Sequence, residues 1–425
     1  MQTTALTDQW IVPTYGRLPV ALELGRGTEV WDEDGKRYLD FAMGIATCSL
    51  GHCPEVIQKT LAEQSAQLIH CSNLFHIRKQ AELAALISEE FLQAPGRTFF
   101  CNSGAEANEG LYKLARRYGQ ARPSPNGPRY EILTFEGSFH GRTLAGISAT
   151  AQEKVKQGFG PLLPGFRHLP FNDVGALQQA VGPETVAILL ECVQGEGGIH
   201  VATPAFLQAI QKLCQEQDLL LLADEVQAGF GRCGERNAWE AILPQSEWET
   251  FQPDAVSWAK GMGGGLPIGA FWIRNQSDRT TDLPALLGAG SHGTTYGGSP
   301  LMSAVSRAVL REILDQNLIE NARSLGHQSR SQIESWNHPA IQEVRGRGLL
   351  LGIQFDEKAL GYLSESKRSG KPVMVALVER LLADGLLTVM AAGGVLRLLP
   401  PLNVSASQIE EGLTILRKTL DTLVE

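Results

Sequence analysis

Two charged residues follow apolar runs in a way that suggests chemistry. Asp224 ends the run LLLLAD, and Lys260 ends the later run AVSWAK. Four consecutive leucines are typical of a strand that is buried on both faces, and open α/β sheets bind ligands beyond the carboxyl ends of such strands. A carboxylate in that place needs a partner for its charge, and a protonated ring nitrogen is suitable. A helix N-cap or a structural ion pair is the alternative role for Asp224.

Lys260 is followed by a glycine-rich loop, GMGGG. A lysine at a strand end, beside a backbone that can approach a ligand closely, is a candidate Schiff-base former, because burial and nearby cations favour its neutral amine. Most lysines, by contrast, are merely solvated. The glycines also suggest a dinucleotide-binding loop, but no G-x-G-x-x-G motif opens a helix after a first strand, so this alternative is disfavoured.

The third feature is the segment CNSGAEANEG, in which a strand is expected to end at Cys101-Asn102 and a helix to begin near Gly104. The backbone N–H groups of Ser103, Gly104 and Ala105 would then lie at the positive end of a helix dipole, where phosphate binds well. Alone, this short motif is a weak signal. Together with Asp224 and Lys260 it indicates a cofactor with a phosphate, a ring nitrogen and an aldehyde.

The elements that must position these residues follow an alternating pattern. Short apolar runs alternate with amphipathic stretches of helical length, which predicts an α/β fold with a mostly parallel sheet. Pro204 to Glu216 carries apolar residues at helical spacing and is expected to cover the sheet. The expected strands are 97–101, 132–135, 186–190, 219–223, 255–259 and 268–273.

The pattern changes near Pro300, which indicates a separate C-terminal domain. We expect one helix from Pro300 to Leu318 and another from Gln328 to Trp336. A single glycine-rich strand is expected in RGRGLLLGIQF, and a final helix begins at Ser405, with Gln408 three positions later completing a capping box.

These boundaries predict three segments. Residues 1–60 would join the small domain, 61–305 would form the large cofactor-binding domain, and 306–425 would form the C-terminal small domain. The segment 122–129 (RPSPNGPR) is expected to be a surface loop inside the large domain, because the alternation of strands and helices resumes on both sides of it.

Charge and composition narrow the classes of partner. The chain has 425 residues and a net charge of −9, without a dense run of Lys or Arg, so neither nucleic acid nor an anionic membrane is an expected partner. The start MQTTALTDQW lacks a basic region followed by an apolar stretch, and no window approaches 18 apolar residues, which predicts a cytoplasmic protein.

The seven cysteines do not form a recognisable framework. Their number is odd and they are spread over half of the chain, which favours reduced thiols over disulfides. His52-Cys53 and His70-Cys71 lack the paired spacing of zinc sites, so no metal is expected.

An ordered set of motifs resembles the class III (ω-amino acid) aminotransferases of PLP fold type I, where PLP is pyridoxal 5′-phosphate. The resemblance extends over nearly the whole chain and is highly specific because the motifs occur together and in order. It implies a large domain with a mostly parallel seven-stranded sheet covered by helices, and a smaller α+β domain built from both chain ends. The motifs include YGRLPVALELGRGTEVWDEDGKRYLDF, SLGHC, SNLF, FCNSGAEANEG, FHGRT, QGEGG, DEVQAGFGR, SHGTTYGGSP, VRGRGLLLGIQF and VLRLLPPLNVS.

The resemblance implies a role for each cofactor-contacting residue. Lys260 would bind the PLP aldehyde and move a proton during the reaction, and Asp224 would pair with the pyridinium nitrogen. Thr295 would reach the phosphate bound by the neighbouring subunit, so a homodimer is expected. Phe139 and Val226 would contact the two ring faces, although both could be plain core residues, and Thr295 could be an ordinary turn hydroxyl. The full implied set is Ser103, Gly104, Ala105, Phe139, His140, Glu191, Asp224, Val226, Gln227 (at the ring hydroxyl), Lys260, Thr294 and Thr295.

The resemblance also implies how substrates bind. Arginine side chains suit carboxylates because a guanidinium can donate two parallel hydrogen bonds. Arg142, assisted by Tyr15, would bind the distant α-carboxylate of the amino donor. Arg397 would bind the α-carboxylate of glutamate or 2-oxoglutarate, and Glu196 would neutralise Arg397 when a terminal amine enters.

The implied reaction is a transamination in which N2-acetyl-L-ornithine, the donor of arginine biosynthesis, gives its terminal amino group to 2-oxoglutarate. Ile45 stands where enzymes acting on free ornithine have a pocket tyrosine, which disfavours that donor. The alternatives are other ω-amino donors (4-aminobutyrate, ornithine, succinylornithine or a lysine-pathway compound), an aminomutase of the glutamate-1-semialdehyde type, and a non-catalytic descendant. Two segments depart from the family pattern: GHCPE at 51–55, where a histidine is missing, and ECVQGE at 191–196.

Overall fold

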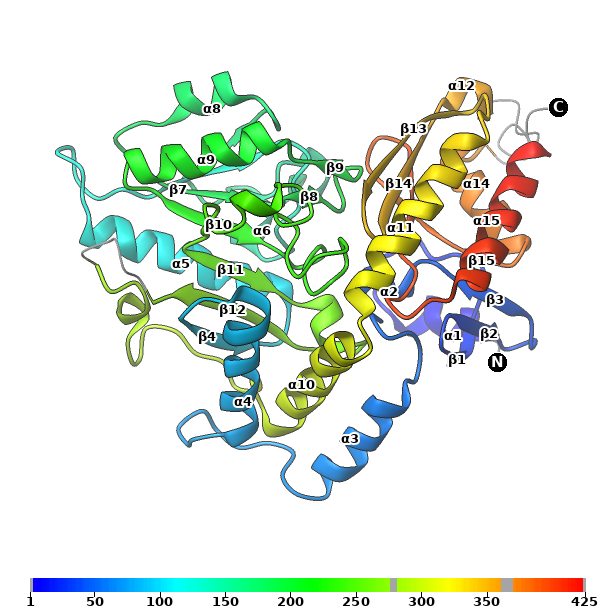
Figure 1. The fold of residues 1–425 in the computed structure, drawn as a ribbon, viewed down its shortest axis with the longest axis horizontal. Helices are drawn as coiled ribbons and strands as arrows, with labels where there is room; N and C mark the ends of the chain where they lie inside the picture. Colours follow the sequence, from blue (N-terminus) through cyan, green and yellow to red (C-terminus); the bar gives the residue numbers. More distant parts are fainter. Residues whose placement is uncertain (1–2, 276–280, 361–369, 423–425) are drawn as a thin grey trace.

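A seven-stranded sheet is the centre of the larger part of the protein (Figure 1). The computed structural model describes residues 3–275, 281–360 and 370–422. The strand order is β4-β12-β11-β10-β7-β5-β6, and β12 runs antiparallel to both of its neighbours while the other pairs are parallel. The mostly parallel α/β fold is thereby confirmed. The strands are β4 (Gly96–Cys101), β5 (Glu131–Phe135), β6 (Phe166–Leu169), β7 (Thr185–Leu190), β10 (Leu220–Asp224), β11 (Ala255–Trp258) and β12 (Gly269–Arg274).

All six expected strands are present, each within one residue of its predicted ends. The edge strand β6 was not predicted, because its sequence FRHL is short and half polar and therefore carries little apolar signal. In contrast, every residue of β7 and β10 is buried, as expected for strands covered on both faces.

Helices cover both faces of the sheet, and the alternation of β10 shows which residues face which helix. Leu220 and Leu222 pack in a cluster with Leu111 and Leu114 of α5 (Gly104–Ala121). Leu221 and Ala223, which point to the other face, pack in the main core with α9 (Pro204–Glu216). The predicted bounds of α9 are confirmed. Because side chains alternate along a strand, Asp224 points to the same face as Leu222, toward α5.

The other helices of this part are short or lie at its margin. The helices α6 and α7 lie between β5 and β6 in the chain, and α8 follows β6, whereas α3 and α4 pack against α10. Their bounds are α3 (Glu55–Ser65), α4 (Arg78–Leu86, continued by a π-helical turn at Ile87–Leu92), α6 (Leu144–Ala149), α7 (Glu153–Lys156), α8 (Val174–Ala180) and α10 (Pro300–Asp315). None of the helices in the described ranges is long and apolar enough to cross a membrane.

The C-terminal part corrects two sequence predictions. The first helix ends at Asp315 and the second, α11, begins at Leu318, ten residues before its predicted start, because Asn317 adopts a left-handed conformation (φ 51°) that separates them. The single predicted strand in RGRGLLLGIQF is wrong. Two antiparallel strands, β13 (Ile341–Arg347) and β14 (Leu350–Phe355), are joined at Gly348, which has φ +51° and lies against the backbone of Cys233.

The remaining C-terminal elements complete the smaller part. The second sheet has the order β13-β14-β17-β16, and the capping box of Ser405 and Gln408 is confirmed at the start of the last helix. The bounds are α11 (Leu318–Ser335), α12 (Glu357–Leu360), α14 (Val373–Ala383), β15 (Leu386–Leu387), β16 (Val389–Ala391), β17 (Val395–Leu398) and α15 (Ala406–Asp421).

The N-terminal strands join this C-terminal part. Strands β1 (Leu22–Arg26), β2 (Glu29–Asp32) and β3 (Arg37–Asp40) form a sheet to which β15 adds in parallel, with Leu386 beside Leu39. In Figure 1 the blue strands accordingly lie beside the red and orange C-terminal elements. This pairing agrees with an N-terminal segment that joins the small domain, while the limits of 60 and 305 stay predictions.

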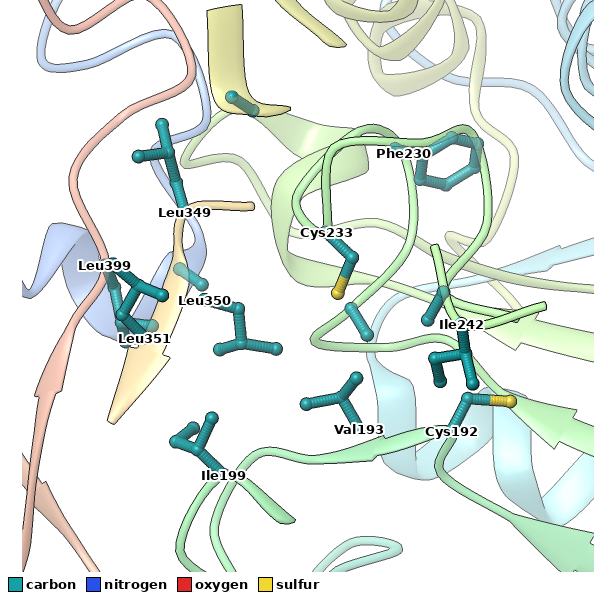
Figure 2. Close-up of a cluster of buried hydrophobic side chains, with 14 of the residues drawn as sticks. Cys192, Val193, Ile199, Phe230, Cys233, Ile242, Leu349, Leu350, Leu351 and Leu399 are labelled. Atoms are coloured by element: carbon teal, nitrogen blue, oxygen red, sulfur yellow. The ribbon is translucent and has the colours of Figure 1, made fainter. Parts of the chain in front are cut away.

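One continuous apolar core connects the large sheet to the C-terminal part. Figure 2 shows Val193 of the short strand β8 (Val193–Gln194) and Cys233, which follows β10 in the chain, opposite Leu350 of β14. The buried guanidinium of Arg232 also crosses this boundary, donating to the carbonyl oxygens of Leu349 and Pro400. The two parts are therefore packed as one body, which fixes β17 and its Arg397 relative to the large sheet.

Candidate active site

A cavity of about 220 Å³ lies at the carboxyl ends of the central strands. Its lining gathers residues from five separate chain segments: Gly104, Ala105, Asn108, Phe139, His140, Gly141, Arg142, Glu191, Glu196, Asp224, Val226, Gln227 and Lys260. A larger, more open hollow of about 410 Å³ lies at the opposite ends of the strands, where Arg129 and Asp218 pair with each other. The smaller cavity is lined by most of the sequence-predicted residues and lies at the strand ends where open α/β sheets bind ligands.

Asp224 is buried at the floor of this cavity and is held by three donors. Its Oδ2 accepts hydrogen bonds from Asn108 Nδ2 (2.7 Å) and His140 Nδ1 (2.8 Å), and its Oδ1 accepts from the backbone N–H of Val226 (3.0 Å). The Oδ1 atom of Asn108 accepts in turn from the Ser257 hydroxyl (2.7 Å). The carboxylate is therefore fixed in one orientation with part of its surface open to the cavity.

Lys260 enters the cavity from the loop after β11. It opens a 3-10 turn (Lys260–Gly263) with φ +44°, a left-handed conformation that is strained for a side-chain-bearing residue and is typical of functional positions. Burial lowers the pKa of its ammonium, and the charge of Arg397 lowers it further, against the opposing effect of Glu196. More of the Lys260 side chain is therefore present as the neutral amine, which is the nucleophilic form.

The helix α5 provides an anion seat at one end of the cavity. Ser103 is its N-cap, and the hydroxyl accepts from the N–H of Glu106 (3.2 Å). The first N–H groups of a helix have no intrahelical partner, so those of Gly104 and Ala105 are available to a phosphate. A Cβ atom at Gly104 would lie 2.7 Å from Val226, so only glycine keeps this seat open.

Glu191 organises the wall beside the ring-stacking candidate Phe139. One of its carboxylate oxygens accepts from the N–H of Phe139 (2.9 Å) and the other from the N–H of Gly195 (3.1 Å). Burial raises the pKa of Glu191 to about 7, and the nearby carboxylate of Asp224 adds to the shift, whereas His140 opposes it. The side chain thus carries a proton for part of the time at neutral pH.

Arg397, from β17, does not line the cavity itself but contacts two residues that do, Glu196 and Gln227, from the C-terminal part. It is buried and forms a two-pronged ion pair with Glu196, with distances of 2.5 and 3.1 Å. Gln227 lies between the two, accepting from Arg397 and donating to Glu196. Although burial raises the pKa of Glu196, the charge and hydrogen bonds of Arg397 outweigh burial and lower it. The structure therefore places Gln227 in this ion-pair network as well as on the cavity wall.

Four of the predicted site residues do not join the hydrogen-bond and ion-pair network of the cavity within a single subunit. Arg142 lines the cavity but is exposed, with its guanidinium 5.4 Å from the centre of the Phe139 ring. Tyr15 is 76% exposed and lies against Arg17. The Thr294 hydroxyl accepts from Asn102 Nδ2 (3.2 Å), and Thr295 is exposed; neither lines the cavity.

Sequence reasoning missed two positioning residues, Asn108 and Ser257. Both signals were present: Asn108 lies one helical turn after Gly104, on the face that also carries Leu111, and Ser257 is the polar residue within the apolar run AVSW. A buried amide or hydroxyl needs a partner, so each was a candidate for a buried polar network. The sequence alone does not show that Asp224 points toward α5 and not toward α9.

The cavity fits a molecule with the chemistry of PLP. The anion seat suits its phosphate, the Asp224 carboxylate its protonated ring nitrogen, and the Lys260 amine its aldehyde. The Nε2 atom of His140 is buried without a hydrogen-bond partner among the described residues, as expected for a group whose partner is a bound molecule.

Comparison with known proteins agrees with this geometry. The sequence pattern of the class-III aminotransferases matches residues 11–420. The chain is 42% identical to the acetylornithine aminotransferase of Caldanaerobacter subterraneus subsp. tengcongensis, covering 98% of both chains. It is 40% identical to that of Thermosynechococcus vestitus, covering 98% of this chain and 97% of the relative.

Solved structures agree as well. The ornithine aminotransferase of Toxoplasma gondii, with PLP at partial occupancy in its active site, superposes with a TM-score of 0.87 at 29% identity, covering 99% of this chain and 94% of that one. The N-acetylornithine aminotransferase of Stenotrophomonas maltophilia K279a gives 0.79 at 32% identity, covering 99% of each chain. The matched family, the full-length similarity and the fitted cavity lead to one conclusion: the chain belongs to the class-III aminotransferases and is a PLP-dependent enzyme.

Proposed function

We propose that the enzyme transfers the terminal amino group of N2-acetyl-L-ornithine to 2-oxoglutarate, giving N-acetyl-L-glutamate 5-semialdehyde and L-glutamate in arginine biosynthesis. The observation that carries the proposal is the ion pair of the buried Arg397 with the half-buried Glu196 near Lys260, since it can serve two kinds of substrate in one cavity. The relatives named acetylornithine aminotransferase, at 38–42% identity over more than nine tenths of the chain, support the choice of donor.

The bound cofactor supplies an electron sink for the carbon that exchanges the amino group. In the proposed roles, Asp224 holds the ring nitrogen protonated, and Asn108 and His140 hold Asp224. The Lys260 amine moves the proton at the reacting carbon, and its lowered pKa suits it to accept that proton. Phe139 and Val226 contact the two ring faces, the N–H groups of Gly104 and Ala105 bind the phosphate, and Glu191 positions Phe139.

Glu196 and Arg397 alternate between two states in this proposal. A terminal-amine donor has no carboxylate at its reacting carbon, so Glu196 stays paired with Arg397 and avoids a buried unpaired cation. With glutamate or 2-oxoglutarate, the α-carboxylate of the substrate binds Arg397 and Glu196 moves away. Arg142, exposed at the cavity rim and assisted by Tyr15, binds the distant carboxylate of the donor.

A donor panel tests the choice of substrate. With 2-oxoglutarate as acceptor, we expect kcat/KM for N2-acetyl-L-ornithine to exceed that for ornithine, succinylornithine or 4-aminobutyrate by about tenfold or more. A higher value for ornithine would favour the activity of the Toxoplasma relative and refute our assignment. Amino-group retention without 2-oxoglutarate would indicate an aminomutase.

We also propose a homodimer in which Thr295 contacts the phosphate bound by the neighbouring subunit. The support is the surface around Thr295: Tyr296 is 67% exposed, and the SNLF segment, hydrogen-bonded to Gly297 through Asn73, exposes Leu74 by 90% and Phe75 by 67%. Exposed apolar groups of this size are typical of interfaces. Sedimentation of the holoenzyme tests the proposal, because an active monomer with full cofactor occupancy would refute it.

We propose the division at residues 60 and 305 as domain limits, which limited proteolysis of the holoenzyme can test.

We propose a cytoplasmic location because all seven cysteines are unpaired in the structure. Cell fractionation can test this location.

A further inference from the structure

The motif SLGHC at residues 49–53 has no role in the proposed reaction, yet its first residue contacts the turn that carries Lys260. The hydroxyl of Ser49 donates a hydrogen bond of 2.7 Å to the carbonyl oxygen of Gly261, which directly follows Lys260. Ser49 is 2% exposed, so water does not compete for this bond. In the part of the chain that the structure describes, no other side chain bonds to the backbone of the Lys260–Gly263 turn.

The turn needs support from outside. Lys260 has φ +44°, and a left-handed conformation at a residue with a side chain persists only where the surrounding structure fixes it. Within the turn, the carbonyl of Gly261 accepts a long bond of 3.3 Å from the N–H of Gly264. A Cβ atom at Gly264 would lie 2.7 Å from Ile57 of α3. Apolar packing therefore supports the C-terminal end of the turn, and Ser49 supports the end next to Lys260.

The segment that carries Ser49 is itself anchored on both sides. The carbonyl oxygen of Ser49 accepts the N–H of Leu402, at 2.8 Å, so the C-terminal part holds the serine backbone. At the other end of the motif, His52 exchanges two backbone hydrogen bonds with Gly27, of 2.7 and 2.9 Å. His52 Nε2 also lies 2.8 Å from Oδ2 of the buried Asp40. A hydroxyl on a segment held in this way is already placed to bind the turn, so little freedom is lost when the bond forms.

We propose that Ser49 is a positioning residue for Lys260, and that its hydroxyl holds the turn so that the lysine amine meets the reacting carbon directly. The inference rests on the proposed role of Lys260. Without the bond, the turn can adopt more than one arrangement and the amine spends less time in the reactive place, which slows each step that the amine performs. Ser49 does not line the cavity, so its loss should leave the binding of both substrates unchanged.

Capture of the cofactor by the full-length enzyme freed of PLP measures the position of Lys260 separately from turnover. When PLP is added, the lysine amine condenses with the aldehyde: a C=N bond forms and one water leaves. Absorbance gives the first-order rate of this step at saturating PLP. Pyridoxamine 5′-phosphate has an amine in place of the aldehyde and cannot form the bond, so its affinity measures the rest of the cavity.

We expect Ser49→Ala to lower the rate of capture about tenfold and to leave the affinity for pyridoxamine 5′-phosphate unaltered. Capture at the wild-type rate would overturn the proposal. A slower capture together with a matching loss of affinity for pyridoxamine 5′-phosphate would also overturn it, because the whole cavity would then have changed.

Ser329→Ala is the matched control. Ser329 is also 2% exposed, and its hydroxyl donates to the carbonyl oxygen of Leu325 at the same distance of 2.7 Å. It lies on α11 and does not line the cavity. The two variants lose the same kind of bond, but only Ser49→Ala should slow capture. An equal slowing in Ser329→Ala would assign the effect to a general loss of stability and refute the special role of Ser49.

Steady-state kinetics of the holoenzyme give a second readout. Ser49→Ala should lower kcat about tenfold and leave KM for the amino donor and for 2-oxoglutarate within about twofold of wild type. A raised KM with an unchanged kcat would assign Ser49 to substrate binding and contradict the proposal.

Lys260→Ala separates the inference from the role on which it rests. If this variant still captures PLP covalently, the proposed role of Lys260 fails, and the inference fails with it. If Lys260→Ala does not capture PLP and Ser49→Ala does so at the wild-type rate, Lys260 keeps its role and only the inference about Ser49 is wrong. Should Ser49→Ala not fold, Ser49→Cys is measured in the same way, because a thiol is a weaker donor than a hydroxyl.

Discussion

The floor and the rim of the active-site cavity are built in opposite ways. At the floor, Asp224 is held by Asn108, His140 and a backbone N–H within the large sheet and its covering helix. At the rim, Glu196 from the large part pairs with Arg397 from the C-terminal part. The Asp224 side chain is 3% exposed, whereas that of Glu196 is 25% exposed. Asp224 at the floor is therefore held in one position, whereas Glu196 at the rim can exchange one partner for another.

The two glutamates of ECVQGE sharpen this contrast. Among the described residues, Glu191 accepts hydrogen bonds from backbone N–H groups alone, and burial raises its pKa to about 7. Glu196 has a cation beside it, and its pKa is lowered. The two carboxylates lie in one short loop, and the local partner, more than the sequence position, decides the charge state of each.

The largest expected effect is at the floor. Asp224→Asn should lower kcat by about 10²–10³-fold, because an amide cannot hold the ring nitrogen protonated and the electron sink is weakened. Single-turnover rates for both half-reactions should fall together. Near-normal turnover in a folded, cofactor-loaded Asp224→Asn enzyme would remove Asp224 from the proposed mechanism.

At the rim, the two half-reactions should instead separate. Glu196→Ala should slow the reaction of the terminal-amine donor by about 2–3 kcal/mol in activation free energy, because it leaves Arg397 buried without a partner. Arg397→Ala should do the reverse and impair glutamate far more than acetylornithine. The two half-reactions are measured separately in each variant, and equal losses would mean that the pair is only structural.

A smaller effect is expected from the residues that support Asp224. Asn108→Ala removes one donor to the carboxylate and should cost about 1–3 kcal/mol of activation free energy, and Ser257→Ala, one bond further away, about 0.5–1.5 kcal/mol. The absorbance spectrum and pH profile of the bound cofactor should change in step. Asn108→Ala with lower stability but unaltered spectrum and kcat would indicate packing alone.

The smallest effect is a pH dependence of stability caused by Glu191. In the unfolded chain this carboxyl ionises near its ordinary pKa of 4.5, and in the folded chain near 7, so the folded state holds the proton more tightly. Its contribution is therefore present below about pH 4.5 and is lost as the pH rises toward 7. Denaturant unfolding of wild type and Glu191→Gln across this range should show a difference that declines with pH. A constant difference would contradict the raised pKa.

Local pattern accounts for much of the fold. The all-apolar runs ending at Asp224 and near Lys260 predicted central strands, and the helix starts expected near Gly104 and at Ser405 are confirmed by the structure. These signals depend on residues close in sequence, so they could be read directly. The hairpin at Gly348 could not, because the need for a turn comes from its contact with the distant Cys233.

The sequence by itself determined which chemical groups the protein has: a lysine and a carboxylate at strand ends, a helix start that can bind phosphate, and the ordered motifs of its family. Only the tertiary structure decided what each group touches. The direction of Asp224 toward Asn108 and the pairing of Glu196 with Arg397 both join elements far apart in the chain. The physical reason is that charge, strain and reactivity depend on distance and burial, which are properties of the packed chain.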